Sequence, residues 1–149
     1  MIRRVVLTGP FGPMTLVDDA GVITRLEWRA ERGEGSDLLA EACRQLTAYF
    51  DRRLTAFDLP FDWGTGINAQ VRRAMAAIPF GETRTYGEIA RAVGAPAQAV
   101  GQACGANPVP ILIPCHRVLG AQGLGGFSAP GGVETKVALL RHEGAAGLL

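Results

Sequence analysis

The sequence predicts an α+β protein, in which a small N-terminal antiparallel sheet with one helix packs on a C-terminal winged-helix-like unit. Two observations carry this prediction. β-Branched and alternating residues are concentrated before residue 30, whereas apolar residues recur at helical spacing in much of the chain after it. Residues 59–66 hold Pro and Gly without a helical period, so we expect the boundary between domains 1–64 and 65–149 there.

The N-terminal domain is expected to form strands followed by a helix. Three β-rich runs are predicted to be strands: residues 4–8, 14–17 and 22–28. Turn-forming residues separate these runs, at Gly9-Pro10-Phe11-Gly12-Pro13 and at Asp18-Asp19-Ala20-Gly21. Ser36 is a candidate N-cap, and apolar positions follow it at helical spacing until about Arg53. We expect this helix to cover one face of the sheet.

The C-terminal domain is predicted to be mostly helical. Four segments place apolar residues at helical spacing: 68–78, 85–93, 96–104 and 134–142. Thr85 and Glu88 have the spacing of a capping box, and Gly94 is expected to end the helix that they begin. Two short helices joined by a glycine turn are typical of a helix-turn-helix.

The composition is that of an ordinary globular domain. The chain has 149 residues, 48% of them hydrophobic and 19% charged. The three cysteines have neither disulfide nor metal-ligand spacing, which favours a reducing compartment and no bound metal. No apolar run approaches the roughly 18 residues of a membrane span, and the first residues do not resemble a signal peptide. We therefore expect a cytoplasmic protein without a membrane partner.

The charge is distributed unevenly between the two halves. The formal net charge is only +1. Residues 1–70 hold eight Lys and Arg against ten Asp and Glu, whereas residues 71–149 hold seven against four. A polyanionic partner is therefore expected to bind the second half.

The segment from Asn107 to Val118 carries the clearest chemical signal. Three prolines restrict the backbone around an apolar run that ends in Cys115, His116 and Arg117. A thiol is a useful nucleophile only as thiolate, which basic or cationic neighbours favour. Glu143 is a candidate to orient the imidazole of His116. The alternative is a buried structural cysteine, and this is the interpretation that we favour for Cys43 and Cys104.

Three ordered motifs show a resemblance to a known family. Pro114-Cys115-His116-Arg117-Val118, with Asn107 upstream, closely resembles the active-site motif of the O6-alkylguanine-DNA alkyltransferases. Residues 81–90 resemble the family's segment around the helix-turn-helix, and residues 136–144 resemble its closing helix. The likeness covers residues 65–144 with specific motifs, whereas residues 1–64 match only in general layout.

The resemblance implies a stoichiometric DNA repair reaction without a cofactor. Cys115 accepts the alkyl group, His116 acts as its base through a water molecule, and Glu143 orients His116. Asn107 holds the active-site loop, and Tyr86 assists the departing guanine by donating a hydrogen bond or a proton. The residues expected to form the substrate pocket are Val118, Phe127 and Ser128.

The resemblance also implies that double-stranded DNA is the partner and that the protein works as a monomer. A base inside a duplex cannot reach a protein thiol, so the damaged nucleotide must be flipped out. No obligate protein partner is expected. The residues expected to contact DNA are Ala97, Gln98 and Gly101 on the second short helix, together with Arg84, Arg91 and Arg117.

The chain departs from the family pattern at three places. Gln98 stands where the family has an arginine that enters the base stack, and residues 96–105 contain neither Lys nor Arg. The loop before Lys136 is two residues longer, as though Ala129-Pro130 were inserted, and residues 67–73 lack the expected aromatic residues. Without a cation at Gln98, we expect modest DNA affinity with a shallow salt dependence.

Two other function classes compete with alkyl transfer. A damage-sensing DNA-binding protein with weak or no transfer would explain Gln98, but it has no chemical need for a thiol beside His116 and Glu143. A Cys-His hydrolase would need an oxyanion hole and would release product without losing its own activity.

Overall fold

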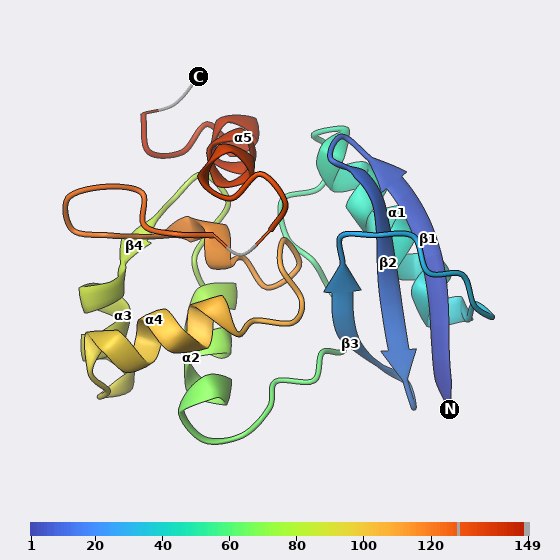
Figure 1. Ribbon diagram of the computed structural model, residues 1–149, viewed down its shortest axis with the longest axis horizontal. Coiled ribbons are helices and arrows are strands. Elements are labelled where there is room, and N and C mark those ends of the chain that lie inside the picture. The colour runs from blue at the N-terminus through green and yellow to red at the C-terminus, as the bar shows by residue number, and fades with distance from the viewer. Residues whose placement is uncertain (128, 148–149) are drawn as a thin grey trace. The chain divides into compact units, whose positions relative to one another are not determined.

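The structure confirms the α+β class: three strands and a helix come first, and the rest of the chain is mostly helical with two short strands (Figure 1). This is a computed structural model that describes residues 1–127 and 129–147. The chain separates into two units, Met1–Asp62 and Trp63–Leu149. Within the described residues, no helix has the length and apolar character needed to cross a membrane.

The N-terminal unit contains an antiparallel sheet in the order β1-β2-β3, with bounds Ile2–Gly9, Gly12–Asp19 and Val22–Glu27. The strands of the first hairpin are longer than predicted. Gly9 pairs with Gly12, so only Pro10 and Phe11 lie in the turn. Gly12 has a φ of +94°, a conformation that glycine adopts without strain, and the chain therefore reverses more tightly than the expected five-residue loop.

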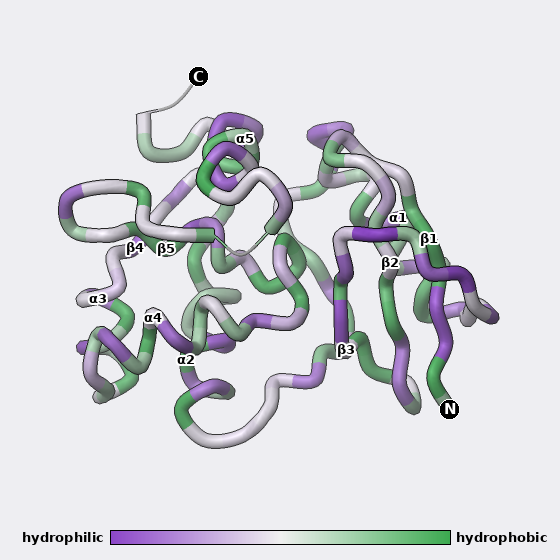
Figure 2. The backbone as a smooth tube through the Cα atoms, in the orientation of Figure 1, coloured by the Kyte–Doolittle hydropathy of each residue, from purple (hydrophilic) through white to green (hydrophobic). Residues whose placement is uncertain are grey.

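Helix α1, Asp37–Phe50, begins at the predicted N-cap. The Ser36 hydroxyl accepts a hydrogen bond from the Leu39 N–H at 3.2 Å and donates one to Asp18 at 2.7 Å, which ties the helix start to β2. The central strand β2 is buried over most of its length, and its hydrophobic residues lie in its middle (Figure 2). The largest fully buried side chains of this unit are Met14, Leu16, Ile23, Leu39, Leu46 and Tyr49.

The C-terminal unit begins with three helices that pack on one another. These are α2, Gly66–Ala76, α3, Tyr86–Val93, and α4, Ala97–Gly105. The capping box at the start of α3 is present: Thr85 Oγ1 accepts from the Glu88 N–H at 3.1 Å, and Glu88 Oε1 accepts from the Thr85 N–H at 3.0 Å. Gly94 ends α3 with a φ of +72°, and α4 starts three residues later, which gives the helix-turn-helix connection.

A short parallel pairing brings the remaining segments together. Strand β4, Arg84–Thr85, pairs with β5, Val118–Leu119. Because α3 follows β4 directly and the 3₁₀ helix η1, Cys115–Arg117, leads directly into β5, this pairing sets the starts of α3 and β5 side by side. Helix α5, Val133–Glu143, closes the unit and ends at Gly144, whose φ is +66°.

Candidate active site

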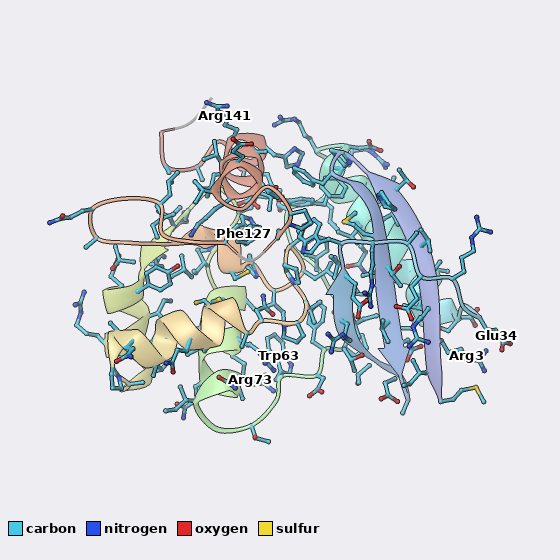
Figure 3. The ribbon with its side chains drawn as sticks, viewed as in Figure 1. Arg3, Glu34, Trp63, Arg73, Phe127 and Arg141 are labelled. Atoms are coloured by element: carbon cyan, nitrogen blue, oxygen red, sulfur yellow. The ribbon has the colours of Figure 1, made fainter. Side chains whose placement is uncertain are left out.

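A cavity of about 270 Å³ within the C-terminal unit contains the predicted nucleophile. Its volume lies just below the roughly 300–1,000 Å³ typical of small-molecule sites. Phe127 supplies an aromatic side chain to its wall (Figure 3). The described residues that line it are Tyr86, Gly101, Cys104, Gly105, Cys115, Gly126 and Phe127.

The loop before Cys115 has a strained backbone and is held by Asn107. Ile111 has a φ of +69°, in a left-handed region that β-branched residues rarely adopt. The Asn107 amide donates to the Ile113 carbonyl at 2.8 Å and accepts from the Val109 N–H at 3.1 Å. Asn107 is itself buried, so these bonds replace water that cannot reach the loop. Asn107 thus bonds to two backbone groups of the loop that leads to Cys115.

His116 and Glu143 form a fully buried pair. His116 Nε2 lies 2.7 Å from Glu143 Oε2, and both side chains have zero exposure. A carboxylate at Nε2 favours the tautomer with its proton there, which leaves Nδ1 as the acceptor. Nδ1 is buried and has no hydrogen-bond partner among the residues that the structure describes. The imidazole is therefore arranged to take a proton at Nδ1 while Glu143 stabilises the cation that results.

The structure corrects the role expected for Arg117. The sequence suggests a contact with DNA phosphates, but the residue is only 5% exposed. Its guanidinium donates to both oxygens of Glu143, at 2.8 and 3.0 Å, and to the Ile78 carbonyl at 2.7 Å. Those bonds occupy the side chain inside the unit, so it is not available to a phosphate. Arg117 instead fixes Glu143 and, through it, His116.

The buried environment keeps the Cys115 thiol and the His116 imidazole neutral. Burial raises the pKa of the Cys115 thiol, although the Asn107 hydrogen bond and the charge of Lys136 act in the opposite direction. Burial also lowers the pKa of His116, against the opposing effect of Glu143. Near pH 7 the Cys115 thiol is therefore protonated and the His116 imidazole is neutral. Proton transfer between them is needed before Cys115 can attack.

Tyr86 and Cys104 also enter the cavity in their neutral forms. Burial raises the pKa of Tyr86, so its hydroxyl remains a proton donor at neutral pH. Burial raises the pKa of Cys104 to about 12, and its thiol contacts Met75 at 3.5 Å. Cys104 is thus a small, protonated lining residue, in agreement with the packing role expected from the sequence.

Lys136 is a site residue that sequence reasoning missed. It is fully buried, and its ammonium donates to the Val118 carbonyl at 2.7 Å and to the Gly126 carbonyl at 3.2 Å. The signal was present in the composition: Lys136 is the only lysine among fifteen Lys and Arg residues.

The residues expected to contact DNA are exposed, apart from Arg117 and the partly exposed Arg84. Ala97, Gln98 and Gly101 lie on the exposed side of α4, and Arg91 is exposed on α3. Arg84 forms an ion pair with Glu82 at 3.2 Å. Of this group, only Gly101 also lines the cavity.

The expected pocket residues have different positions. Phe127 lines the cavity, but Val118 is fully buried, so a bound base would reach its side chain only if the cavity wall moved. Ser128 lies outside the described residues. Within the described residues, no group of three or more His, Cys, Asp or Glu side chains is placed to hold a metal ion.

Comparison with known families defines the class of protein that combines this fold with a buried cysteine. The ribonuclease-like domain of 6-O-methylguanine DNA methyltransferase matches residues 2–63, and the DNA binding domain of the same family matches residues 66–145. The chain belongs to the 6-O-methylguanine DNA methyltransferase family. The resemblance inferred from the motifs of residues 65–144 is confirmed, and it extends into the N-terminal part, where the sequence showed only a similar layout.

Relatives of similar length support the assignment. The methylated-DNA–protein-cysteine methyltransferase of Mycobacterium bovis is 43% identical over 155 residues, covering 96% of this chain and 93% of its own. That of Methanosarcina acetivorans is 38% identical and covers 93% and 96%. The crystal structure of Mycobacterium tuberculosis O6-methylguanine methyltransferase gives a TM-score of 0.84 at 41% identity, covering 96% and 93%. A structure of M. tuberculosis OGT in complex with DNA gives 0.82 at 44% identity, covering 93% and 90%.

Proposed function

We propose that this protein repairs DNA by transferring the alkyl group of O6-alkylguanine to Cys115 in a single-turnover reaction. The observation that carries the proposal is the position of Cys115 in a cavity, beside a buried His116–Glu143 pair in a family of methyltransferases. The thioether that forms is stable, so each protein molecule acts once. The thiol and the alkylated guanine supply all the atoms and electrons of the transfer, so the reaction needs no cofactor.

Deprotonation of the thiol is the first step. His116 takes the Cys115 proton at Nδ1, through a bridging water, and Glu143 stabilises the imidazolium. The thiolate then attacks the saturated carbon bound to O6, forming the S–C bond as the C–O6 bond breaks. The electron pair of the broken bond moves onto the guanine. Soft, polarisable sulfur suits this displacement.

Tyr86 assists the departure of the guanine. Its hydroxyl faces the same cavity as Cys115 and is held neutral by burial, which raises its pKa. Donation of a hydrogen bond or proton to the guanine offsets the charge that it gains. Phe127 and Ser128 are proposed to contact the flipped base.

Binding to duplex DNA is assigned to residues 65–149, through the exposed side of α4. Ala97 and Gly101 are small enough to let the helix approach the groove, while Gln98 is proposed to occupy the space that the flipped nucleotide leaves. Arg84 and Arg91 are the proposed phosphate contacts. The protein is proposed to act as a monomer.

Intact-protein mass measurement tests the proposal. Purified protein is incubated with a duplex carrying one O6-methylguanine, beside a Cys115→Ser control. Addition of one methyl group, located on Cys115 and absent from the control, is the expected result. Repeated conversion of substrate with no change in protein mass would instead support a hydrolase, and an unchanged DNA and protein would contradict transfer.

A damage-sensing role is the second candidate, because α4 exposes Gln98 and contains no Lys or Arg. This role requires selective binding of the damaged duplex without transfer. Competition between damaged and undamaged duplexes, measured together with protein mass, separates it from repair. Selective binding with no mass increase favours the sensor.

A further inference from the structure

The burial of Lys136 has no ordinary explanation. Lysine is almost never fully buried unless it is paired, yet Lys136 has zero exposure. Its hydrogen-bond acceptors are two backbone carbonyls, at Val118 and Gly126. Across residues 1–127 and 129–147, no carboxylate lies within ion-pair distance of this ammonium. A buried cation without a carboxylate is costly, so a compensating role is expected in the site that it adjoins.

The two carbonyls that Lys136 binds belong to different parts of the cavity surroundings. Val118 is in β5, directly after η1, and Gly126 lines the cavity. The preceding residue, Gly125, packs against Tyr86 so closely that an added Cβ would lie 3.0 Å from its ring and hydroxyl. The Lys136 ammonium itself lies 5.9 Å from the centre of the Tyr86 ring. One side chain thus links the loop of residues 120–126 to β5 and lies close to Tyr86.

Lys136 is also a positive charge that has no carboxylate partner among the described residues and that binds the wall of the cavity lined by Cys115. The titratable groups around Cys115 are Lys136 from α5, Tyr86 from α3, Cys104 from α4 and His116 within η1. Tyr86 and Cys104 are neutral because burial raises their pKa, and burial lowers the pKa of His116. Arg117 is neutralised by Glu143. The anion available to Lys136 is therefore the Cys115 thiolate, once it forms.

We propose that Lys136 is a positioning residue of the alkyl-acceptor site, holding the cavity wall in place through Val118 and Gly126 and stabilising the Cys115 thiolate by its charge. The inference rests on the proposed function, because that function is what makes the cavity an alkyl-acceptor site. Its two physical consequences, a more acidic thiol and a fixed loop, are measurable without DNA.

The thiol consequence is tested by the pH dependence of Cys115 carbamidomethylation by iodoacetamide, followed by peptide mass spectrometry so that Cys43 and Cys104 are read separately. Lys136→Met removes the charge and keeps a similar side-chain length. We expect its midpoint for Cys115 to move up by about one pH unit, because an opposite charge at close range typically shifts a pKa by about 1–3 units. Lys136→Arg keeps a cation and should retain most of the wild-type profile.

Arg141→Met is the matched control. Arg141 is on the same helix, is exposed, and loses the same charge on substitution (Figure 3). It should leave the Cys115 midpoint unchanged. A shift of equal size in Arg141→Met would mean that net charge, rather than the position of Lys136, sets the profile, and would overturn the proposal.

The loop consequence is tested by limited chymotrypsin digestion. Leu124 and Phe127 are cleavage sites next to the Gly126 carbonyl that Lys136 binds. Cleavage there should be several-fold faster in Lys136→Met than in the wild type or in Arg141→Met, at equal global stability by urea unfolding. If Lys136→Met does not fold, Lys136→Arg decides, because a conserved Cys115 midpoint supports the role of charge and a lost one refutes it.

Unchanged midpoint and unchanged cleavage in folded Lys136→Met would overturn the inference. Methyl transfer from O6-methylguanine DNA is measured on the same proteins. A wild type without transfer refutes the proposed function while leaving the thiol and loop results valid. If the wild type transfers the methyl group but Lys136→Met keeps the wild-type Cys115 midpoint and the wild-type rate of loop cleavage, only the role of Lys136 is refuted.

Discussion

The exposed face of α4 and the buried site around Cys115 use charge in opposite ways. The helix that is proposed to meet a polyanion presents Gln98 and Gln102 and has no cation. The buried site holds Arg117, Lys136 and Glu143, all shielded from water. Inside the protein, each charge is strengthened by the low dielectric but must be compensated. Of these two regions, the chain therefore concentrates its charge in the buried site, so the proposed attraction to DNA depends on a few exposed arginines and on backbone groups.

Glu143→Gln should disrupt the buried site and have the largest effect of the variants considered. It leaves Arg117 buried without a counter-charge, which typically costs about 3–5 kcal/mol of unfolding free energy. It also removes the anion that stabilises protonated His116, so methyl transfer should slow by about 10²–10⁴-fold. Urea unfolding and single-turnover kinetics measure the two effects.

Glu134→Gln is the matched control, because Glu134 lies exposed in the first turn of the same helix. Its unfolding free energy should change by less than about 0.5 kcal/mol. A loss below about 1 kcal/mol in Glu143→Gln would show that the buried network contributes little to stability.

Asn107→Ala should give the next largest effect. The Val109 N–H loses its acceptor inside the loop, which costs about 1–3 kcal/mol for a buried donor. Cys115 also loses a hydrogen bond that lowers its pKa, so the midpoint of its reaction with iodoacetamide should rise. Asn68→Ala, at the exposed start of α2, should change neither quantity. Equal results for the two variants would contradict the loop-holding role.

The sequence predicts the local features of the protein better than the contacts between segments that are distant in the chain. The strands, the Ser36 cap, the Thr85–Glu88 capping box and the glycine that ends α3 follow from local rules, and the structure contains them all. Cys115, His116 and Glu143 could be proposed from their residue types. The direction of Arg117 could not, because it depends on the approach of α5 to η1, which no local pattern encodes.

Lys136 was missed for the same reason. A lysine on a helix is normally solvated, and only the fold brings the carbonyls of Val118 and Gly126 to its ammonium. The predicted helix ends also differ from the observed ones by a residue or two: α2 spans Gly66–Ala76, whereas residues 68–78 were expected. Residues whose roles depend on contacts distant in sequence are therefore the ones that sequence reasoning assigns least well.

The pH dependence of stability should reveal how completely His116 is shielded. Burial lowers its pKa below the value near 6.5 of the unfolded chain, so the unfolded state binds the proton first as the pH falls. Unfolding free energy should therefore decrease as the pH falls from about 7 to 5, by at most about 1.4 kcal/mol per pH unit for this group. Urea unfolding across that range measures the slope.

The control for this slope uses the second histidine. His142→Gln leaves the His116–Glu143 pair intact and should keep the wild-type slope, whereas His116→Gln should reduce it. If the slope disappeared in His142→Gln, then His142 rather than His116 would be the cause of the pH dependence. Stability that rises as the pH falls would contradict a buried, neutral His116.

Gln98→Arg adds a charge to the exposed face of α4 and should have the smallest effect. One added cation on α4 should make the slope of log affinity against log salt steeper by about 0.9, the value for one further phosphate contact on duplex DNA. Gln102→Arg, exposed one turn later, is the control. Equal steepening in both variants indicates general attraction to the polyanion. A faster methyl transfer in Gln98→Arg alone would instead show that position 98 acts on the flipped nucleotide, since the added charge is the same in both proteins.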